Sequence, residues 1–209
     1  MSLPTLASVR QALSRHERRE LPALPGRTNH LSAGVLVPLR WREDVEVLLT
    51  LRTSHLSLHA GEISFPGGRR DAEDVNLEAT ALREAREEIG LMSAEVIGRL
   101  SSIPLYTSDY RLDPYVAHVG ETQLAINPDE VERLVVVGVR EILDRDVQHG
   151  IPWEHAGQRY LAPVFETEAR LVFGGTAYAL WELVQVLAPA FERPTPALTP
   201  GKYSWQDVL

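Results

Sequence analysis

The chain has 209 residues, of which 44% are hydrophobic and 24% charged, the mix of an ordinary globular protein. A domain of this size buries roughly 70% of its unfolded surface, so it needs neither a metal nor a disulfide to fold. The chain contains no cysteine. This excludes disulfide frameworks, thiolate nucleophiles, iron–sulfur clusters and cysteine-based zinc sites.

The formal net charge is −8, from 21 Lys and Arg against 29 Asp and Glu. The chain therefore lacks the basic footprint of a nucleic-acid-binding protein, and we expect no nucleic-acid partner. A polyanionic substrate would need positive charge from elsewhere, and divalent metal ions are the obvious source. No run approaches the ~20 apolar residues of a membrane span, and no secretory signal is evident. We expect a cytoplasmic protein without membrane contact.

The first elements are a helix, a connector and a hairpin. Residues 6–20 place apolar residues among charged ones at helical spacing, which predicts an amphipathic helix. Residues 21–27 are rich in Pro and Gly and predict a turn-rich connector. Two Val- and Leu-rich runs, residues 32–39 and 45–51, predict strands joined as a hairpin by the polar residues between them.

The strongest helical pattern in the chain covers residues 76–89. Leu82, Ala85 and Ile89 recur on one face, with charged residues opposite, and Gly90 predicts the end of the helix.

The rest of the chain mixes short strands and helices without strict alternation. This favours an α+β fold, in which a mixed β-sheet is covered by helices on both faces. We expect residues 1–27 to pack on a domain of residues 28–192. The Pro-, Thr- and Gly-rich residues 193–209 predict a loosely ordered tail. The predicted strands are residues 95–100, 115–119, 133–139, 158–165 and 170–173, and the predicted helices are residues 139–144 and 176–187.

Three glutamates crowd one side of the helix predicted over residues 76–89. Glu84 and Glu88 are four residues apart, and Glu87 is three residues from Glu84. Like charges at this spacing repel, and they lie at the helix end where the dipole disfavours anions. A solvated acidic face is one explanation, since Arg83 and Arg86 offset part of the charge. The other is binding of Mg²⁺, which takes carboxylate oxygens together with substrate phosphates.

The neighbouring residues favour the metal-binding interpretation. A Pro-Gly-Gly turn ending at Gly67 and Gly68 precedes the helix, and its backbone can approach a phosphate or metal without interference from a Cβ atom. Residues 67–91 resemble the signature of the Nudix hydrolases, G-x5-E-x7-R-E-U-x-E-E-x-G-U, where U is aliphatic. The loop acid here is Asp74 instead of Glu, and eight residues instead of seven separate it from Arg83. The helix glutamates stay in register.

The segment before this signature is similar to an additional motif of the coenzyme A pyrophosphatase branch of that family. The branch pattern is L-L-T-x-R-S/A-x3-R-x3-G-x3-F-P-G-G. Residues 48–52 and the FPGG run ending at Gly68 match it, and Gly61 stands at its isolated Gly. Thr53 stands for the Ser or Ala of the pattern. Ser57 stands where the second Arg is expected.

The resemblance implies a Nudix fold, an α/β/α sandwich, and a set of site residues. It implies that Glu84, Glu87 and Glu88, with the backbone of Gly68, bind Mg²⁺ or Mn²⁺. It leaves two candidates for the general base, Glu84 and Glu130. Candidate substrate-binding residues are Arg52, His59, Gly67, Gly68 and Arg83.

The expected substrate is a small nucleotide, and the resemblance favours coenzyme A or a derivative, cleaved to 3′,5′-ADP and 4′-phosphopantetheine or its acyl form. Another nucleotide, such as ADP-ribose, a dinucleotide or a non-standard nucleoside triphosphate, is the alternative. An inactive Nudix domain used for ligand sensing is a third reading, and the retained glutamates argue against it. We expect a monomer or a homodimer. His55 and His59 are four residues apart but no third zinc ligand accompanies them, so a zinc site is not expected.

Overall fold

The computed structural model describes residues 3–56, 58–120, 122–155 and 157–208. Within these ranges the helices are α1 (Leu6–Arg15), α2 (Leu77–Ile89), α3 (Val139–Leu143) and α4 (Gly174–Leu187), with 3-10 turns η1 (Ala188–Phe191) and η2 (Trp205–Asp207). The strands of the main sheet are β1 (Leu31–Trp41), β2 (Val45–Arg52), β3 (Ile63–Ser64), β4 (Gly67–Arg69), β5 (Glu95–Arg99), β6 (Ile103–Pro104), β7 (Tyr110–Val119) and β8 (Val131–Gly138). The remaining strands are β9 (Val147–His155), β10 (Gln158–Pro163), β11 (Phe165–Glu166), β12 (Leu171–Val172) and β13 (Ala197–Pro200).

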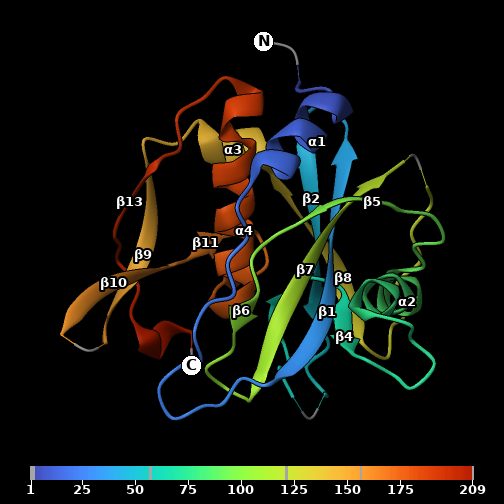
Figure 1. Cartoon of the computed structure of the whole chain (residues 1–209), viewed down its shortest axis with the longest axis horizontal. Helices are drawn as coiled ribbons and strands as arrows, with labels where there is room; N and C mark the ends of the chain where they lie inside the picture. Colours follow the sequence, from blue (N-terminus) through green and yellow to red (C-terminus); the bar gives the residue numbers. More distant parts are fainter. Residues whose placement is uncertain (1–2, 57, 121, 156, 209) are drawn as a thin grey trace.

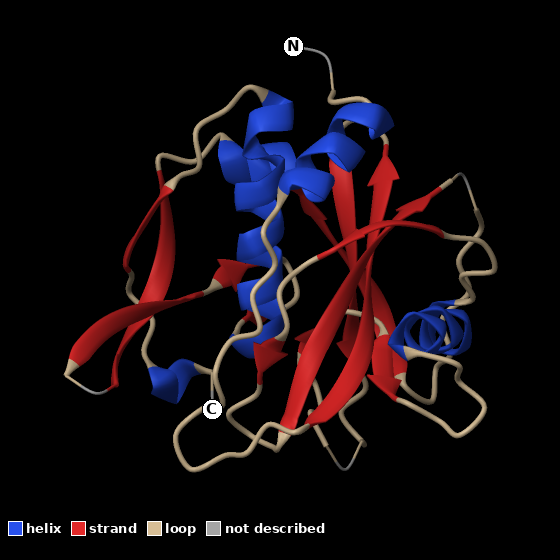
Figure 2. Cartoon of the chain, viewed as in Figure 1, coloured by secondary structure: helices blue, strands red, loops and turns tan. Residues whose placement is uncertain are grey.

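The main sheet is mixed. Its strands run in the order β3-β2-β1-β7-β5, and β4, β6 and β8 pair with β1, β7 and β2 respectively. The hairpin predicted between β1 and β2 is confirmed, with Leu39 opposite Val47 in an antiparallel register. β1 and β7 pair in parallel along ten residues of each strand, whereas the other pairs of this sheet are antiparallel (Figure 2).

Helices cover both faces of this sheet, as predicted (Figure 1). Side chains of β1 alternate between the two faces. Val35 and Val37 join the larger apolar cluster, to which α4 contributes Leu180 and Leu183. Leu36 faces the other way and packs in a second cluster with residues of α2. The predicted α+β architecture is therefore confirmed.

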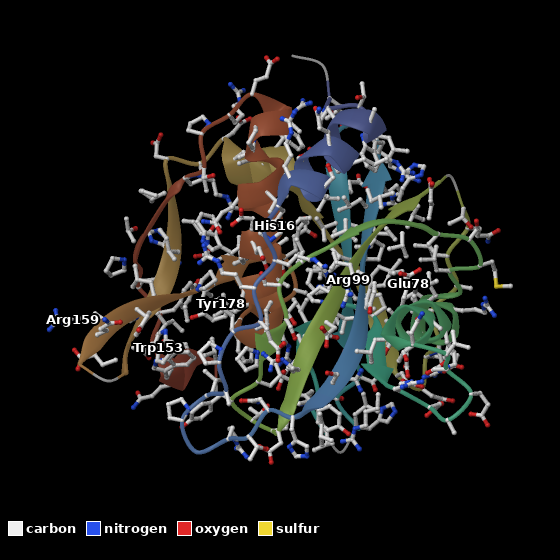
Figure 3. The ribbon with its side chains drawn as sticks, in the orientation of Figure 1. His16, Glu78, Arg99, Trp153, Arg159 and Tyr178 are labelled. Carbon is white, nitrogen blue, oxygen red and sulfur yellow. The ribbon has the colours of Figure 1, made fainter. Side chains whose placement is uncertain are left out.

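The N-terminal helix is shorter than predicted: α1 ends at Arg15 and not at Glu20. His16 leaves the helix in an extended conformation, and its Nε2 lies 2.6 Å from an Oε1 atom of Glu182 on α4. The same carboxylate accepts hydrogen bonds from the Ser101 backbone and hydroxyl. These contacts stop the helix and attach the N-terminal segment to α4, beside which Figure 3 shows His16.

The C-terminal segment is also more regular than predicted. β13 pairs in parallel with β9, which pairs with β10, so these strands form a second sheet. The Trp205 indole donates a hydrogen bond to the Pro152 carbonyl at 3.3 Å. The expectation of a loosely ordered tail is therefore wrong for these residues, because their backbone and the Trp205 ring find partners on β9. No helix among the described residues is long and apolar enough to span a membrane.

Candidate active site

Helix α2 has clear start and stop signals that fix its glutamates in space. The Asn76 side chain accepts a hydrogen bond from the Ala79 N–H at 2.8 Å, and Gly90 ends the helix in a left-handed conformation. Ala81, Ala85 and Ile89 are fully buried against the sheet. Burial of this face turns Glu84 and Glu88 toward β4, with which α2 makes extensive contact.

Gly68 on β4 lies directly against Glu84. A Cβ atom built on Gly68 would lie 2.5 Å from Oε1 of Glu84, closer than atoms can approach. β4 pairs with β1, where Gly34 is opposite Gly68, so the strand cannot move away without breaking the sheet. The absence of a side chain at this position therefore lets the peptide backbone border the carboxylate.

Glu88 is a buried carboxyl group without full hydrogen bonding. Its residue is 1% exposed, and its Oε2 atom has no partner among the described residues. Its Oε1 atom lies 3.6 Å from the Arg52 guanidinium, whose own buried Nε is also unpartnered. Burial raises the pKa of Glu88 to about 8, and Arg52 offsets this only in part, because the long ion pair does not replace the lost hydration. The charges of Glu84 and Glu130 raise this pKa further.

Arg83 forms ion pairs with Glu84 and Glu87, the other two glutamates predicted to bind metal. Its guanidinium lies 2.9 Å from Glu84 and 3.0 Å from Glu87. Glu84 is largely buried, which raises its pKa although Arg83 opposes the shift. The Glu87 side chain is 54% exposed, so it lies at the rim and not beside Glu88.

Asp74 anchors Arg83 from the other side. It is 7% exposed and accepts hydrogen bonds from the Arg83 Nε and Nη2 atoms at 3.1 Å, from the Thr80 hydroxyl and from the Asp71 N–H. The hydrogen bonds, that with Arg83 foremost, lower the pKa of Asp74 to about 2. The sequence left the role of this loop acid open, and in the structure it fixes Arg83.

The loop before β8 brings Glu130 to the end of α2. The Asn127 N–H donates to the Glu88 carbonyl at 2.9 Å, and the Thr53 N–H donates to the Glu130 carbonyl at 3.0 Å. The Asn127 amide lies 3.5 Å from Oε1 of Glu130. Asn127 was not among the predicted site residues. Its place in the Asn-Pro-Asp-Glu run was the available signal, and the run alone does not show which side chain contacts Glu130.

The histidines lie outside the carboxylate cluster. His59 is half-exposed and its Nδ1 lies 3.1 Å from Glu62, an interaction that raises the pKa of His59. Arg52 is close enough to oppose this shift. His55 contacts the Asp129 carbonyl at 3.0 Å. Ser57, at the departure from the branch motif, lies outside the described residues.

The carboxylates suit a hard cation, although they do not already surround a metal-sized space. Within the described ranges, no group of three or more His, Asp or Glu side chains is spaced to hold a metal ion. Arg83 accounts for this, since it draws Glu84 and Glu87 to itself. The unpartnered oxygen of buried Glu88, with Glu84 and the backbone of Gly68 nearby, is the oxygen donor set that Mg²⁺ prefers.

A groove on the protein surface lies away from these carboxylates. It has a volume of about 1030 Å³ and is lined by β9, β10, β13 and Trp205. Its charged lining residues are Glu154 and Arg159, which pair with each other. Glu154 is the only acid among the described residues that line it, so this groove lacks a carboxylate cluster like that of α2.

Comparison with known proteins supports the fold and identifies a family. Residues 29–156 match the family model of the NUDIX domain. The chain is 34% identical over 172 residues to an "Uncharacterized Nudix hydrolase NudL" of Photorhabdus laumondii, spanning 79% of this chain and 91% of the relative. A protein of the same name from Yersinia pestis is 34% identical over 157 residues, which cover 73% of this chain and 78% of the relative.

Among solved structures, a MutT/nudix family protein from Enterococcus faecalis aligns with a TM-score of 0.51 at 16% identity, covering 91% of this chain and 76% of the other. At that identity the similarity concerns the fold alone. The family match and the relatives together place the chain in the Nudix hydrolase family.

Proposed function

We propose that this Nudix hydrolase is a Mg²⁺- or Mn²⁺-dependent pyrophosphatase of coenzyme A or its derivatives, yielding 3′,5′-ADP and 4′-phosphopantetheine or its acyl form. The observation that carries the hydrolytic site is Glu88, a buried carboxyl group with an unpartnered oxygen beside Glu84 and the Gly67–Gly68 backbone. The coenzyme A assignment is supported by the motif that ends at Gly68.

Glu84, Glu88 and the Gly68 carbonyl would hold the divalent ions, and Glu87 would complete the set from the rim. Bound metal supplies neutralisation of the diphosphate charge and a more acidic water. Without metal, Arg83, fixed by Asp74, is the cationic partner of Glu84 and Glu87. A metal that draws these carboxylates inward would replace Arg83 as their main cationic partner.

Glu130 is the proposed general base. The oxygen of a water molecule attacks one phosphorus, the anhydride P–O bond breaks, and Glu130 takes the proton of the water. Glu84 is the less suitable base, because a carboxylate that holds a metal ion is a poor proton acceptor. Asn127 and the Thr53 N–H fix the Glu130 loop beside Glu88.

Arg52 and His59 are the proposed phosphate contacts. Arg52 is the last residue of β2. Its partly buried guanidinium lies 3.6 Å from Glu88, and its Nε has no partner among the described residues. A guanidinium binds phosphate through two parallel hydrogen bonds, which suits this position. His59 lies near Arg52 and its pKa is raised, which favours its cationic form.

The alternative is hydrolysis of another nucleotide, such as ADP-ribose, a dinucleotide or a non-standard triphosphate. It is favoured by Ser57, which replaces the second Arg of the coenzyme A motif. Incubation of the protein with coenzyme A, ADP-ribose and nucleoside triphosphates, with Mg²⁺ or Mn²⁺, separates the two by the masses of the products. We expect 3′,5′-ADP from coenzyme A, and intact coenzyme A beside cleaved ADP-ribose would contradict the assignment.

A further inference from the structure

The turn between β11 and β12 fixes the backbone of one arginine, Arg170. The Thr167 hydroxyl accepts hydrogen bonds from the Ala169 and Arg170 N–H groups at 3.2 Å and donates to the Arg170 carbonyl at 2.7 Å. Antiparallel pairing of Phe165 with Val172 holds both ends of the turn. The backbone of Arg170 therefore has one well-defined position.

The Arg170 guanidinium lies flat against Gly61. Its Cζ and Nη1 atoms are 3.3 Å from the position that a Cβ atom of Gly61 would take. Gly61 has φ of 68°, a left-handed conformation that side-chain-bearing residues rarely adopt. Gly61, the isolated Gly of the motif before the Nudix signature, therefore leaves room for the guanidinium of Arg170, more than 100 positions later in the chain.

The contact between Arg170 and Gly61 is next to the candidate active site. The carbonyl of Glu62, the residue after Gly61, accepts a hydrogen bond from the Arg52 N–H at 2.9 Å. Arg52 in turn lies 3.6 Å from Glu88. β12 also packs against β3, which joins the Arg170 turn to the same edge of the sheet.

Arg170 has no acidic partner to neutralise it. In the part of the chain that the structure describes, no carboxylate forms an ion pair with its exposed guanidinium, whereas Arg83, Arg111 and Arg145 all have such partners. The chain carries a net charge of −8, so positive charge on this turn is not part of a generally basic surface. An exposed guanidinium that lies against Gly61 and has no carboxylate partner among the described residues suits a phosphate group.

We propose that Arg170 is a specificity-determining residue that binds a phosphomonoester of the nucleotide substrate outside the diphosphate that is cleaved. The inference rests on the proposed function. Coenzyme A carries such a group, the 3′-phosphate of its ADP portion, and ADP-ribose does not. Arg170 selects between these substrates by binding, while the carboxylates of α2 act on the diphosphate that both contain.

Calorimetric binding of 3′,5′-ADP and of 5′-AMP to the full chain tests this directly, because the two ligands differ only in the 3′-phosphate. We expect the wild type to bind 3′,5′-ADP on the order of 10-fold more tightly than AMP. R170A should abolish this preference with AMP affinity unchanged, and R170K should recover part of it. R159A is the matched control, since Arg159 is an exposed arginine on β10, far from α2 in Figure 3.

Two results would overturn the inference: a wild type without preference for 3′,5′-ADP, or an R170A variant that keeps the wild-type preference. A parallel assay of coenzyme A hydrolysis by the wild type tests the proposed function separately. Failure of that assay with intact 3′-phosphate selectivity would reject coenzyme A as the substrate and retain Arg170 as a phosphate-binding residue.

Discussion

At the scale of single residues, Glu88 stands in an environment that is unfavourable for a carboxylate unless a cation joins it. The side chain is buried, and one of its oxygens has no hydrogen-bond partner among the residues that the structure describes. Arg52 contributes a cation at 3.6 Å, too far for a good hydrogen bond. A buried acceptor without a partner costs roughly 1–3 kcal/mol, more when it is charged, so stability alone does not explain this residue.

The raised pKa of Glu88 predicts how stability depends on pH in the metal-free protein. Between 4.5, its ordinary value, and about 8, the folded state keeps the proton of Glu88 while the unfolded state releases it. Stability from this group is therefore complete below 4.5 and is lost as the pH rises to about 8. The loss is at most about 1.4 kcal/mol per pH unit.

Denaturant unfolding with EDTA, across that window, checks this prediction. The free energy of unfolding of the wild type should fall more steeply with pH than that of E88Q, whose side chain does not ionise. Parallel curves for the two proteins would show that Glu88 titrates normally.

The proposed general base gives a second prediction at this scale. E130Q should lower kcat about 100-fold or more, the usual contribution of a positioned base, while the affinity for Mn²⁺ stays the same. E132Q is the control, because Glu132 is an exposed residue two positions later on β8. Equal kcat for E130Q and the wild type would return the role to Glu84.

At the scale of elements, the close packing of α2 on β4 makes Gly68 a sensitive position. In G68A the new methyl group would collide with Glu84, so the carboxylate or the strand must move. We expect kcat to fall by about 100-fold, because a shift near 1 Å at a reacting group has this effect. G120A is the matched control because, its chain neighbours aside, no atom of the described residues lies within 4 Å of the added methyl group. Similar kcat values for G68A and G120A would argue against the proposed metal-binding edge.

The elements that the sequence predicts well are those with local signals. Asn76 and Gly90 mark both ends of α2 within one residue, because capping is a local interaction. The sequence predicts that β7 begins at Tyr115, because Pro114 interrupts the strand pattern. In the structure β7 begins at Tyr110, because pairing with β1 outweighs the local effect of Pro114. β9 contains Gly150 and Pro152 and was missed for the same reason.

The candidate site shows the same difference between features that local sequence predicts and features that depend on tertiary contacts. Glu84, Glu87 and Glu88 are evident because a helix places residues three and four positions apart on one side. The contacts of Asp74 with Arg83, and of Arg170 with Gly61, depend on how loops fold in three dimensions. No periodicity in the chain encodes those contacts, so only the structure shows them.

At the scale of the whole molecule, the C-terminal segment is part of the folded structure. β13 pairs with β9, and Arg193 forms an ion pair with Asp144 at 3.0 Å. Deletion of residues 193–209 should therefore destabilise the protein by on the order of 2 kcal/mol, which lowers Tm by about 4–8 °C for a chain of this size. Calorimetry of the truncated and full chains measures the difference, and an unchanged Tm would restore the expectation of a loosely ordered tail.

The placement of the acidic residues explains how a protein of negative net charge could act on a polyanionic nucleotide. Glu84, Glu87 and Glu88 account for part of its formal negative charge, and bound metal would supply positive charge there. The central claim is therefore that Glu88 binds a divalent cation. Calorimetric titration of Mn²⁺ into metal-free wild type and E88Q near neutral pH tests it most directly. We expect the affinity to fall at least about 10-fold in E88Q, the loss of one charged ligand contact. Equal affinities in the two proteins would contradict the account.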